Sequence, residues 1–216
     1  MSMRSIGYSF NNAIADIIDN SITAEADLIK IQCLWNGEEP TIEIEDNGKG
    51  MSENELIEAM RPGTKSPLSS RSNDDLGRFG LGLKTASFSQ CKKLIIKTFQ
   101  DKLINEASWD LDIVQEQNKW FLDLENSQEN TKNLKTGTIV RWEKIDTLSK
   151  KNIEDAEETF NSMVSNLGKH IGITFHRYIN GDKRKINFIV NGIKCEAFDP
   201  FFKEKSTPLP IELIKN

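Results

Sequence analysis

The stretch from Ala13 to Ala24 carries the side chains with the clearest chemical potential. At about 100° of rotation per residue in a helix, Asp16, Asn20 and Thr23 fall on one narrow stripe, and isoleucines fall on the opposite arc. A carboxylate and a carboxamide are costly to bury unless they are hydrogen-bonded or bind an ion. The helix therefore predicts either a solvated polar face or a ligand site, and alone it is more typical of the solvated face.

Two further stretches favour the ligand site. IEIEDNGKGM at 42–51 ends an alternating strand pattern on Asp46, so a strand positions this carboxylate. LGRFGLGLKTAS at 76–87 places glycines and Lys84 at the start of a helix, where free backbone N–H groups bind anions. The glycine spacing is neither that of a P-loop nor that of a dinucleotide fingerprint. One such loop is more often a tight packing turn, but the three segments together indicate one phosphate-bearing ligand.

The elements that must position these residues follow from the same patterns. Ser52 and Glu55 form a capping box, which predicts a short helix after the second strand. Alternating apolar residues predict strands at 28–35, 41–46, 92–99, 103–111, 119–125 and 136–144. This order predicts an α+β fold whose sheet is mixed and mostly antiparallel, with helices on one face.

The region after about residue 148 predicts additional structure. Apolar residues recur at three- and four-residue steps from Ile153 to Ile171, which predicts a long amphipathic helix. The segments 173–179 and 185–190 flank an Asn-Gly-Asp sequence and predict a hairpin, and Asn191-Gly192 predicts a further turn. We therefore expect one domain at 1–147, followed at 148–216 by an extension or the start of a second α/β domain.

Composition limits the classes of function. The 216 residues are 37% hydrophobic and 28% charged, as in ordinary globular proteins, and the net charge of -5 gives no general attraction to nucleic acid or anionic membranes. No apolar run is long enough to cross a membrane and no signal peptide is evident, so we expect a cytoplasmic protein without membrane contact. The three cysteines are too widely spaced to predict a disulfide framework or a zinc site.

Four ordered motifs carry a resemblance to a known superfamily. DNSITA at 19–24, DNGKGM at 46–51 and GRFGLGLKTAS at 77–87, followed by Thr136-Gly137-Thr138, resemble the motifs of the ATPases of DNA gyrase, heat-shock chaperones, histidine kinases and MutL (GHKL). The resemblance covers roughly residues 5–145 and is strongest to the microrchidia (MORC) type and its bacterial relatives. It implies a Bergerat-type two-layer α/β sandwich that binds ATP and Mg²⁺.

The resemblance also implies roles for individual residues. Asn20 would ligate Mg²⁺ through its side-chain oxygen. Asp46 would accept a hydrogen bond from the adenine amino group. Gly50 and Met51 would shape the base pocket, and Thr138 would support the adenine side through water. The phosphate and lid contacts would come from Lys65, Gly77, Arg78, Phe79, Gly80, Leu81, Gly82, Leu83 and Lys84.

Asp16 departs from the superfamily pattern. Hydrolysing members of the gyrase, chaperone and MutL type usually carry a glutamate four residues before the magnesium asparagine, where it acts as the general base. A general base must come within hydrogen-bond distance of the proton that it removes, directly or through one water. The shorter Asp16 leaves a slow ATPase and an ATP-binding switch with little hydrolysis both open. For the neighbouring Asp19, a solvated or capping role is favoured over catalysis.

The resemblance extends to partners. ATP would close the lid at 63–76 and promote homodimerisation, and hydrolysis would leave ADP. Any DNA, repair or defence partner would act through domains that this chain lacks. A histidine protein kinase catalytic domain is a third hypothesis, disfavoured because no helical hairpin with a phosphoacceptor histidine precedes the helix that carries Asn20.

Overall fold

The computed structural model describes residues 8–37, 39–61, 82–127, 136–146, 153–182 and 184–201. Its helices are α1 (Phe10–Thr23), α2 (Glu53–Met60), α3 (Gly82–Gln90), α4 (Leu111–Gln117), α5 (Ile153–Thr174) and α6 (His176–Asn180). Its strands are β1 (Leu28–Leu34), β2 (Thr41–Asp46), β3 (Lys93–Gln100), β4 (Leu103–Asp110), β5 (Asp123–Ser127), β6 (Gly137–Glu143), β7 (Asn187–Val190) and β8 (Ile193–Lys194).

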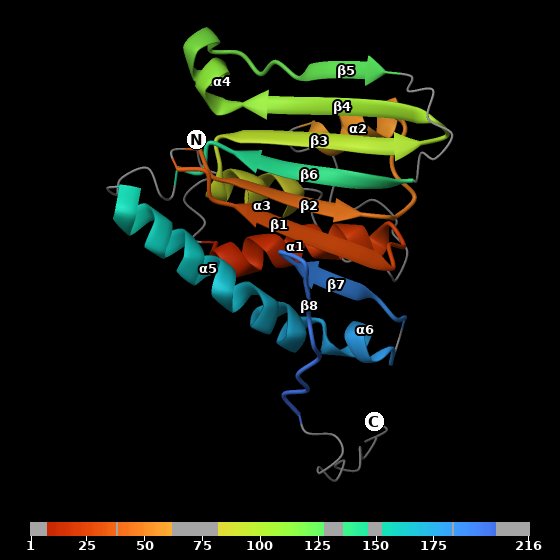
Figure 1. Ribbon diagram of the computed structural model, residues 1–216. Helices are drawn as coiled ribbons and strands as arrows, with labels where there is room; N and C mark the ends of the chain where they lie inside the picture. Colours follow the sequence, from red (N-terminus) through yellow and green to blue (C-terminus); the bar gives the residue numbers. More distant parts are fainter. Residues whose placement is uncertain are drawn as a thin grey trace, which may run out of the picture.

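The strands form one sheet in the order β5-β4-β3-β6-β2-β1-β7-β8. Neighbouring strands are antiparallel except for β1 and β7, which are parallel. Helices α1, α2 and α3 cover one face of this sheet (Figure 1). The predicted α+β class and mixed sheet are confirmed, and the arrangement is the Bergerat-type two-layer sandwich that the resemblance implies. In the described ranges, no helix combines the length and apolar character needed to cross a bilayer.

The main core lies between the sheet and these helices. Every second residue of the central strands points toward the helices, because successive side chains of a strand alternate between its faces. One such row is in register across four strands and consists of Ile31, Ile44, Val140 and Ile96. All four are buried, and they face a layer to which the isoleucines of α1 belong. The apolar arc of the first helix is therefore the side that packs on the sheet.

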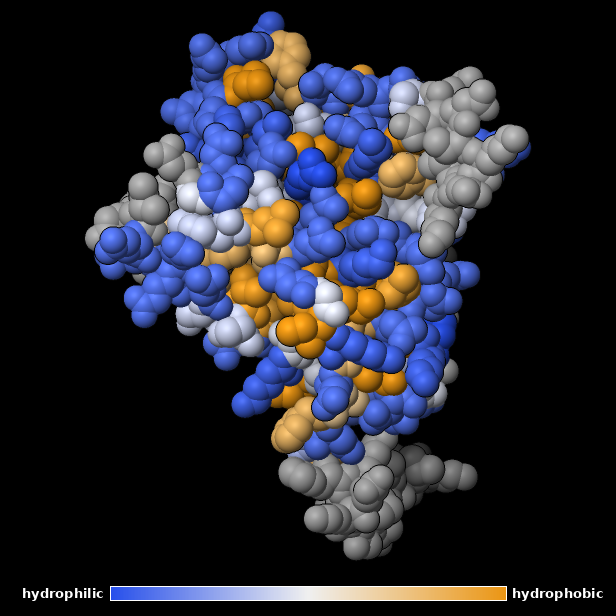
Figure 2. All heavy atoms as spheres, viewed as in Figure 1, coloured by the Kyte–Doolittle hydropathy of each residue, from blue (hydrophilic) through white to orange (hydrophobic). Residues whose placement is uncertain are grey.

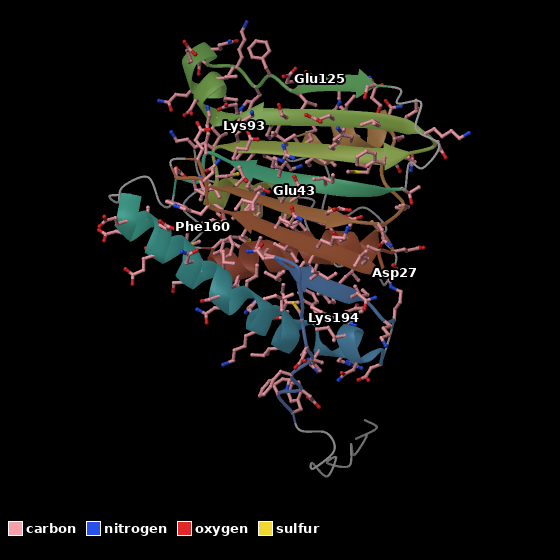
Figure 3. The ribbon with its side chains drawn as sticks, viewed as in Figure 1. Asp27, Glu43, Lys93, Glu125, Phe160 and Lys194 are labelled. Atoms are coloured by element: carbon pink, nitrogen blue, oxygen red, sulfur yellow. The ribbon has the colours of Figure 1, made fainter. Side chains whose placement is uncertain are left out.

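The opposite face of the sheet carries charged side chains in cross-strand pairs. Glu43 of β2 accepts a hydrogen bond from Nε of Arg141 on β6 at 2.9 Å. Lys93 of β3 lies 2.8 Å from Glu143 of β6. Figure 2 shows this face as mostly hydrophilic, with separate apolar spots between the charges, and Figure 3 shows Glu43 and Lys93 on it. Pairing of opposite charges allows one face of an antiparallel sheet to stay in water.

Most sequence-predicted elements are confirmed, with small shifts at their ends. The capping box forms: Ser52 accepts from the backbone of Glu55, and the Glu55 side chain accepts from Ser52. The strand expected at 119–125 is β5, which begins further along the chain, at Asp123. The short helix α4 was not predicted; Asp110 is its N-cap and accepts from the backbone of Asp112 at 3.0 Å.

The predicted hairpin of 173–179 with 185–190 is wrong. Its first half is helical, because α5 continues to Thr174 and α6 follows at His176. Ile171 and Phe175 are one helical turn apart and both are buried, so burial along a helical face overrides the strand-like composition. Gly181, at φ +87°, ends α6 in the left-handed conformation that glycine favours. The turn predicted at Asn191-Gly192 forms, and it joins β7 to β8.

The C-terminal elements extend the same sheet. Strand β7 pairs with β1, and the side chain of Asn191 donates to and accepts from the backbone of Cys33. Arg184 donates to the carbonyls of Ile22 and Ala26, both at 3.0 Å, at the end of α1. Helix α5 also packs against α1 and β7. The segment after 153 thus supports the helix that carries Asp16, while the division at 147/148 stays a prediction.

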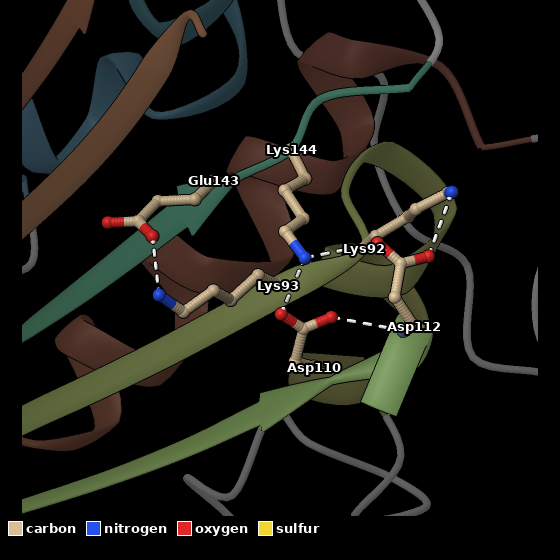
Figure 4. A network of polar contacts seen from close by, with 6 residues as sticks. All are labelled: Lys92, Lys93, Asp110, Asp112, Glu143 and Lys144. Atoms are coloured by element: carbon tan, nitrogen blue, oxygen red, sulfur yellow. Dashed lines mark hydrogen bonds and ion pairs between the residues drawn. The ribbon is translucent and has the colours of Figure 1, made fainter. Parts of the chain in front are cut away.

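An ionic network closes one end of β3, β4 and β6 (Figure 4). Lys144 Nζ lies 2.7 Å from Asp110 and 3.1 Å from Asp112, and Lys92 Nζ lies 2.9 Å from Asp112. Hydrogen bonds from Lys92 and Lys144 lower the pKa of Asp112, and the bond to Asp110 raises the pKa of Lys144. The network therefore stabilises the fold most at pH values above the lowered pKa of Asp112 and below the raised pKa of Lys144.

We expect Lys144→Met to lower the free energy of unfolding by about 1 kcal/mol at pH 7, since most of these groups are partly exposed. The difference from the unchanged protein should shrink as the pH falls through the lowered pKa of Asp112, and also as it rises through the raised pKa of Lys144. Urea unfolding at several pH values measures this. Lys169→Met, which removes an exposed lysine of α5, is the control; an equal effect of both substitutions would contradict the assignment.

Candidate functional site

Helix α1 presents the predicted polar stripe. Ser9 is its N-cap and accepts from the backbone of Asn12 at 3.2 Å, so the helix begins just ahead of the stripe. Asp16 is half-buried, whereas Asn20 and Thr23 are exposed. The hydroxyl of Tyr8 donates to Oδ2 of Asp16 at 2.8 Å. The candidate base is therefore held by a side chain from outside its own helix.

A second carboxyl lies close to Asp16. Burial, together with the nearby charge of Asp16, raises the pKa of Asp19 to about 6. The two residues are three positions apart on α1, where helical side chains are neighbours. Asp19 therefore keeps its proton to a higher pH than an ordinary aspartate.

Asp46 is the buried carboxylate of the site, at 8% exposure. It accepts hydrogen bonds of 2.9 Å from the Ser21 hydroxyl of α1 and from the backbone N–H of Gly48. Burial raises the pKa of Asp46, and these two bonds together with one from the backbone of Thr138 oppose that rise. A carboxylate has about four acceptor positions, so a further donor can still be accepted.

A row of polar residues crosses the helix-facing side of the sheet next to the apolar row of Ile44. It is in register over β2, β6, β3 and β4, and we call it the polar row: Asp46, Thr138, Thr98 and Asn105. All four are buried. The Thr98 and Thr138 hydroxyls lie 3.3 Å apart, and Thr98 also accepts from the backbone N–H of Met51 at 2.8 Å. Asn105 donates to the carbonyl of Met51 at 3.3 Å. The row fixes the loop that follows Asp46.

Two glycines allow backbones to touch beside this row. A Cβ on Gly50 would lie 2.1 Å from the Phe99 carbonyl oxygen, and one on Gly137 would lie 2.1 Å from that of Asp46. Both glycines also have positive φ, +70° and +147°. No other residue type satisfies both constraints without a backbone shift. The predicted pocket residue Gly50 is thus required by the fold itself.

Helix α3 begins against Asp16. A Cβ added to Gly82 would lie 3.9 Å from Oδ2 of Asp16, an ordinary contact distance, and among the described residues it would meet no other atom within 4 Å. Free N–H groups at a helix N-terminus attract anions. The structure therefore brings Asp16 of α1 and Gly82 of the glycine loop together, and the neighbouring Leu83 is half-buried.

Lys84 lies deeper than a surface phosphate ligand. Its side chain is fully buried, and Nζ donates to the carbonyls of Ala59 at 2.9 Å and Arg61 at 2.6 Å. Burial lowers the pKa of Lys84. Two of its three donors thus satisfy carbonyls at the C-terminal end of α2. A phosphate contact by Lys84 stays a prediction.

Several predicted site residues lie outside the described residues: Lys65, Gly77, Arg78, Phe79, Gly80 and Leu81. Within the described ranges, no group of three or more histidine, cysteine, aspartate or glutamate side chains is arranged to hold a metal ion. A magnesium site here would need oxygens from the bound ligand besides that of Asn20.

Four residues that support the site were not predicted from the sequence: Tyr8, Ser21, Thr98 and Asn105. Ser21 stands alone on the isoleucine arc of α1, and Thr98 follows Leu94 and Ile96 at the alternating positions of β3. A polar residue in a core-facing position needs a buried partner, and this is the signal that identifies such residues. No pattern in the sequence connects Tyr8 with Asp16.

Residues 8–157, more than half of the chain, match the family model described as Histidine kinase-, DNA gyrase B-, and HSP90-like ATPase. The chain belongs to this family. This GHKL-type ATPase domain is also similar to ATPase morc-1 of Caenorhabditis elegans, with 32% identity over 93 residues. That match covers 43% of the chain and 10% of the relative, so the chain spans about a tenth of the relative's length. The superfamily and the MORC-like kinship expected from the motifs are confirmed.

We expect Lys84→Met to lower the free energy of unfolding by about 1–3 kcal/mol, because methionine fills the space but leaves the carbonyls of Ala59 and Arg61, at the C-terminal end of α2, without this donor. Urea unfolding measures the change. Lys97→Met removes a partly exposed lysine on the open face of the sheet and is expected to cost no more than about 0.5 kcal/mol. An equally small effect of both substitutions would contradict a capping role for Lys84.

Proposed function

We propose that this GHKL-type domain binds ATP together with Mg²⁺ and hydrolyses the ATP slowly, with Asp16 as the general base. The observation that carries the proposal is the polar row, which interrupts an otherwise apolar sheet face. Its buried carboxylate, Asp46, has acceptor capacity left after its protein bonds. Groups of this kind are retained in a core when they recognise a ligand.

The polar row supports recognition of the adenine ring. Among the described residues, the donors to Asp46 are the neutral groups of Ser21, Gly48 and Thr138, and an exocyclic amino group is one further neutral donor. The Thr138 hydroxyl lies next to it in register and can hold a water against the base. Met51 is half-buried beside the row and offers an apolar surface.

The phosphate end is supported by α1 and α3. Ser21 lies five positions after Asp16, about 7.5 Å along a helix, so one helix reaches both the adenine carboxylate and the start of α3. Asn20 is an exposed residue, as a side chain that ligates magnesium in a complex with ATP must be. When bound, Mg²⁺ would offset phosphate charge. The N–H groups from Gly82 onward would contact the phosphate oxygens.

Asp16 would orient the attacking water and accept its proton. It is one methylene shorter than the usual glutamate, which favours a second candidate function: a switch that binds ATP and scarcely hydrolyses it. Lid closure over 63–76, an ATP-dependent homodimer, a cytoplasmic location and a DNA, repair or defence partner rest on the family resemblance, and we include them in the proposal on that basis.

A single-turnover assay with ATP labelled on the γ-phosphate tests the proposal. We expect phosphate release in Mg²⁺ to slow at least about 100-fold in Asp16→Asn, which keeps the side-chain shape but cannot accept the proton. The affinity for ATP should change less than about threefold. Release at the original rate would place the base elsewhere, and no release from the unchanged protein would favour the switch.

Gly82→Ala tests the phosphate end. The added methyl group meets no atom of the described residues closer than 3.9 Å, so stability should stay within about 1 kcal/mol, but it occupies space beside Asp16 and should weaken ATP binding at least about tenfold. Calorimetric titration with ATP measures the affinity. Gly168→Ala is a matched control, because its Cβ would also meet its nearest atom, Cys195 Sγ, at 3.9 Å within a helix. Equal affinities of the two variants would argue against phosphate at the start of α3.

A further inference from the structure

Tyr8 connects the candidate base to a second element of the site. It lies just before α1, and its hydroxyl is 2.8 Å from Oδ2 of Asp16. The ring is half-buried and packs against the hydrophobic core. The hydrogen bond to Asp16 is the main reason that the pKa of the Tyr8 phenol is raised, so Tyr8 stays protonated at neutral pH and remains a donor.

The backbone of Tyr8 is held from the other side of the site. Gln90, the last residue of α3, donates from Nε2 to the Tyr8 carbonyl at 3.3 Å, and Gln90 itself is buried. The next residue, Ser9, caps α1. Tyr8 is thereby fixed to both helices that meet at Asp16, and its hydroxyl has a preset direction.

The hydrogen bond from Tyr8 restricts the orientation of the Asp16 carboxylate. An aspartate carboxylate turns easily about its terminal torsion, which has a broad two-fold preference. A hydrogen bond from Tyr8 to Oδ2 stops that rotation. Among the described residues no donor contacts Oδ1, so this oxygen keeps its capacity to accept a proton from water. A base that is already oriented loses less entropy when it meets its substrate.

We propose that Tyr8 is a positioning residue that holds Oδ2 of Asp16, so that Oδ1 faces the attacking water. This inference rests on the proposed function. In the step, the water oxygen bonds to the γ-phosphorus, the bond from that phosphorus to the bridging oxygen breaks, and ADP leaves with the electron pair. The water proton passes to Oδ1, and Tyr8 keeps its own proton throughout.

Tyr8→Phe removes the hydroxyl and keeps the ring. We expect single-turnover phosphate release to slow at least about tenfold, while the dissociation constant for ATP changes less than about twofold. The chain has two tyrosines, and Tyr178→Phe is the matched control, expected to leave the release rate and the dissociation constant unchanged.

A double-mutant cycle tests the bond without any turnover. Urea unfolding of Tyr8→Phe, Asp16→Ala and the double variant should show non-additive effects on stability, because each substitution removes one partner of the same hydrogen bond. Additive effects would overturn the inference.

The kinetic outcomes separate the two proposals. If Tyr8→Phe releases phosphate at the original rate while Asp16→Asn is slow, the positioning role fails and the proposed function stands. If Asp16→Asn is as fast as the unchanged protein, or if the unchanged protein releases nothing, the proposed function fails and the role of Tyr8 fails with it.

Discussion

The burial of the Asp46 carboxylate is the constraint on which the site depends. A charged group inside an apolar core is tolerated only when several donors surround it. Ser21, Gly48 and Thr138 supply them, and they come from the helix, the loop and the neighbouring strand. Satisfying one carboxylate therefore aligns three segments that are far apart in the sequence.

The close backbone approaches beside Asp46 follow from the same constraint. The loop after β2 can return over the sheet only where no Cβ intervenes, which is why Gly50 and Gly137 lie against carbonyl oxygens. Thr98 and Asn105 then anchor Met51 through its backbone N–H and carbonyl. Because side chains of neighbouring strands are in register, four polar residues on four strands form one continuous row.

Helix α1 connects the surroundings of Asp46 with the other end of the site, because it carries both Ser21 and Asp16. Its apolar arc packs on the sheet, which turns Asp16 and Asn20 toward the opposite side. The C-terminal elements hold the same helix: α5 packs along it, and the Arg184 guanidinium binds carbonyls at its end, where the helix dipole favours positive charge. A segment outside the ATPase motifs thus contributes to the rigidity of the helix that carries them.

Local patterns in the sequence were sufficient to predict the fold class, most strands, the polar stripe of α1 and the capping box of α2. Periodicity and caps depend on residues close together in the chain, so these features are readable without a structure. The composition of 173–179 predicted a strand wrongly, because packing against the core, and not the local sequence, decides between helix and strand there. Tertiary structure alone decided the deep burial of Lys84, the polar row and the contact of Tyr8 with Asp16, because each needs partners that are 8 to 92 positions apart along the chain. Such partners meet only after the sheet and its helices have assembled.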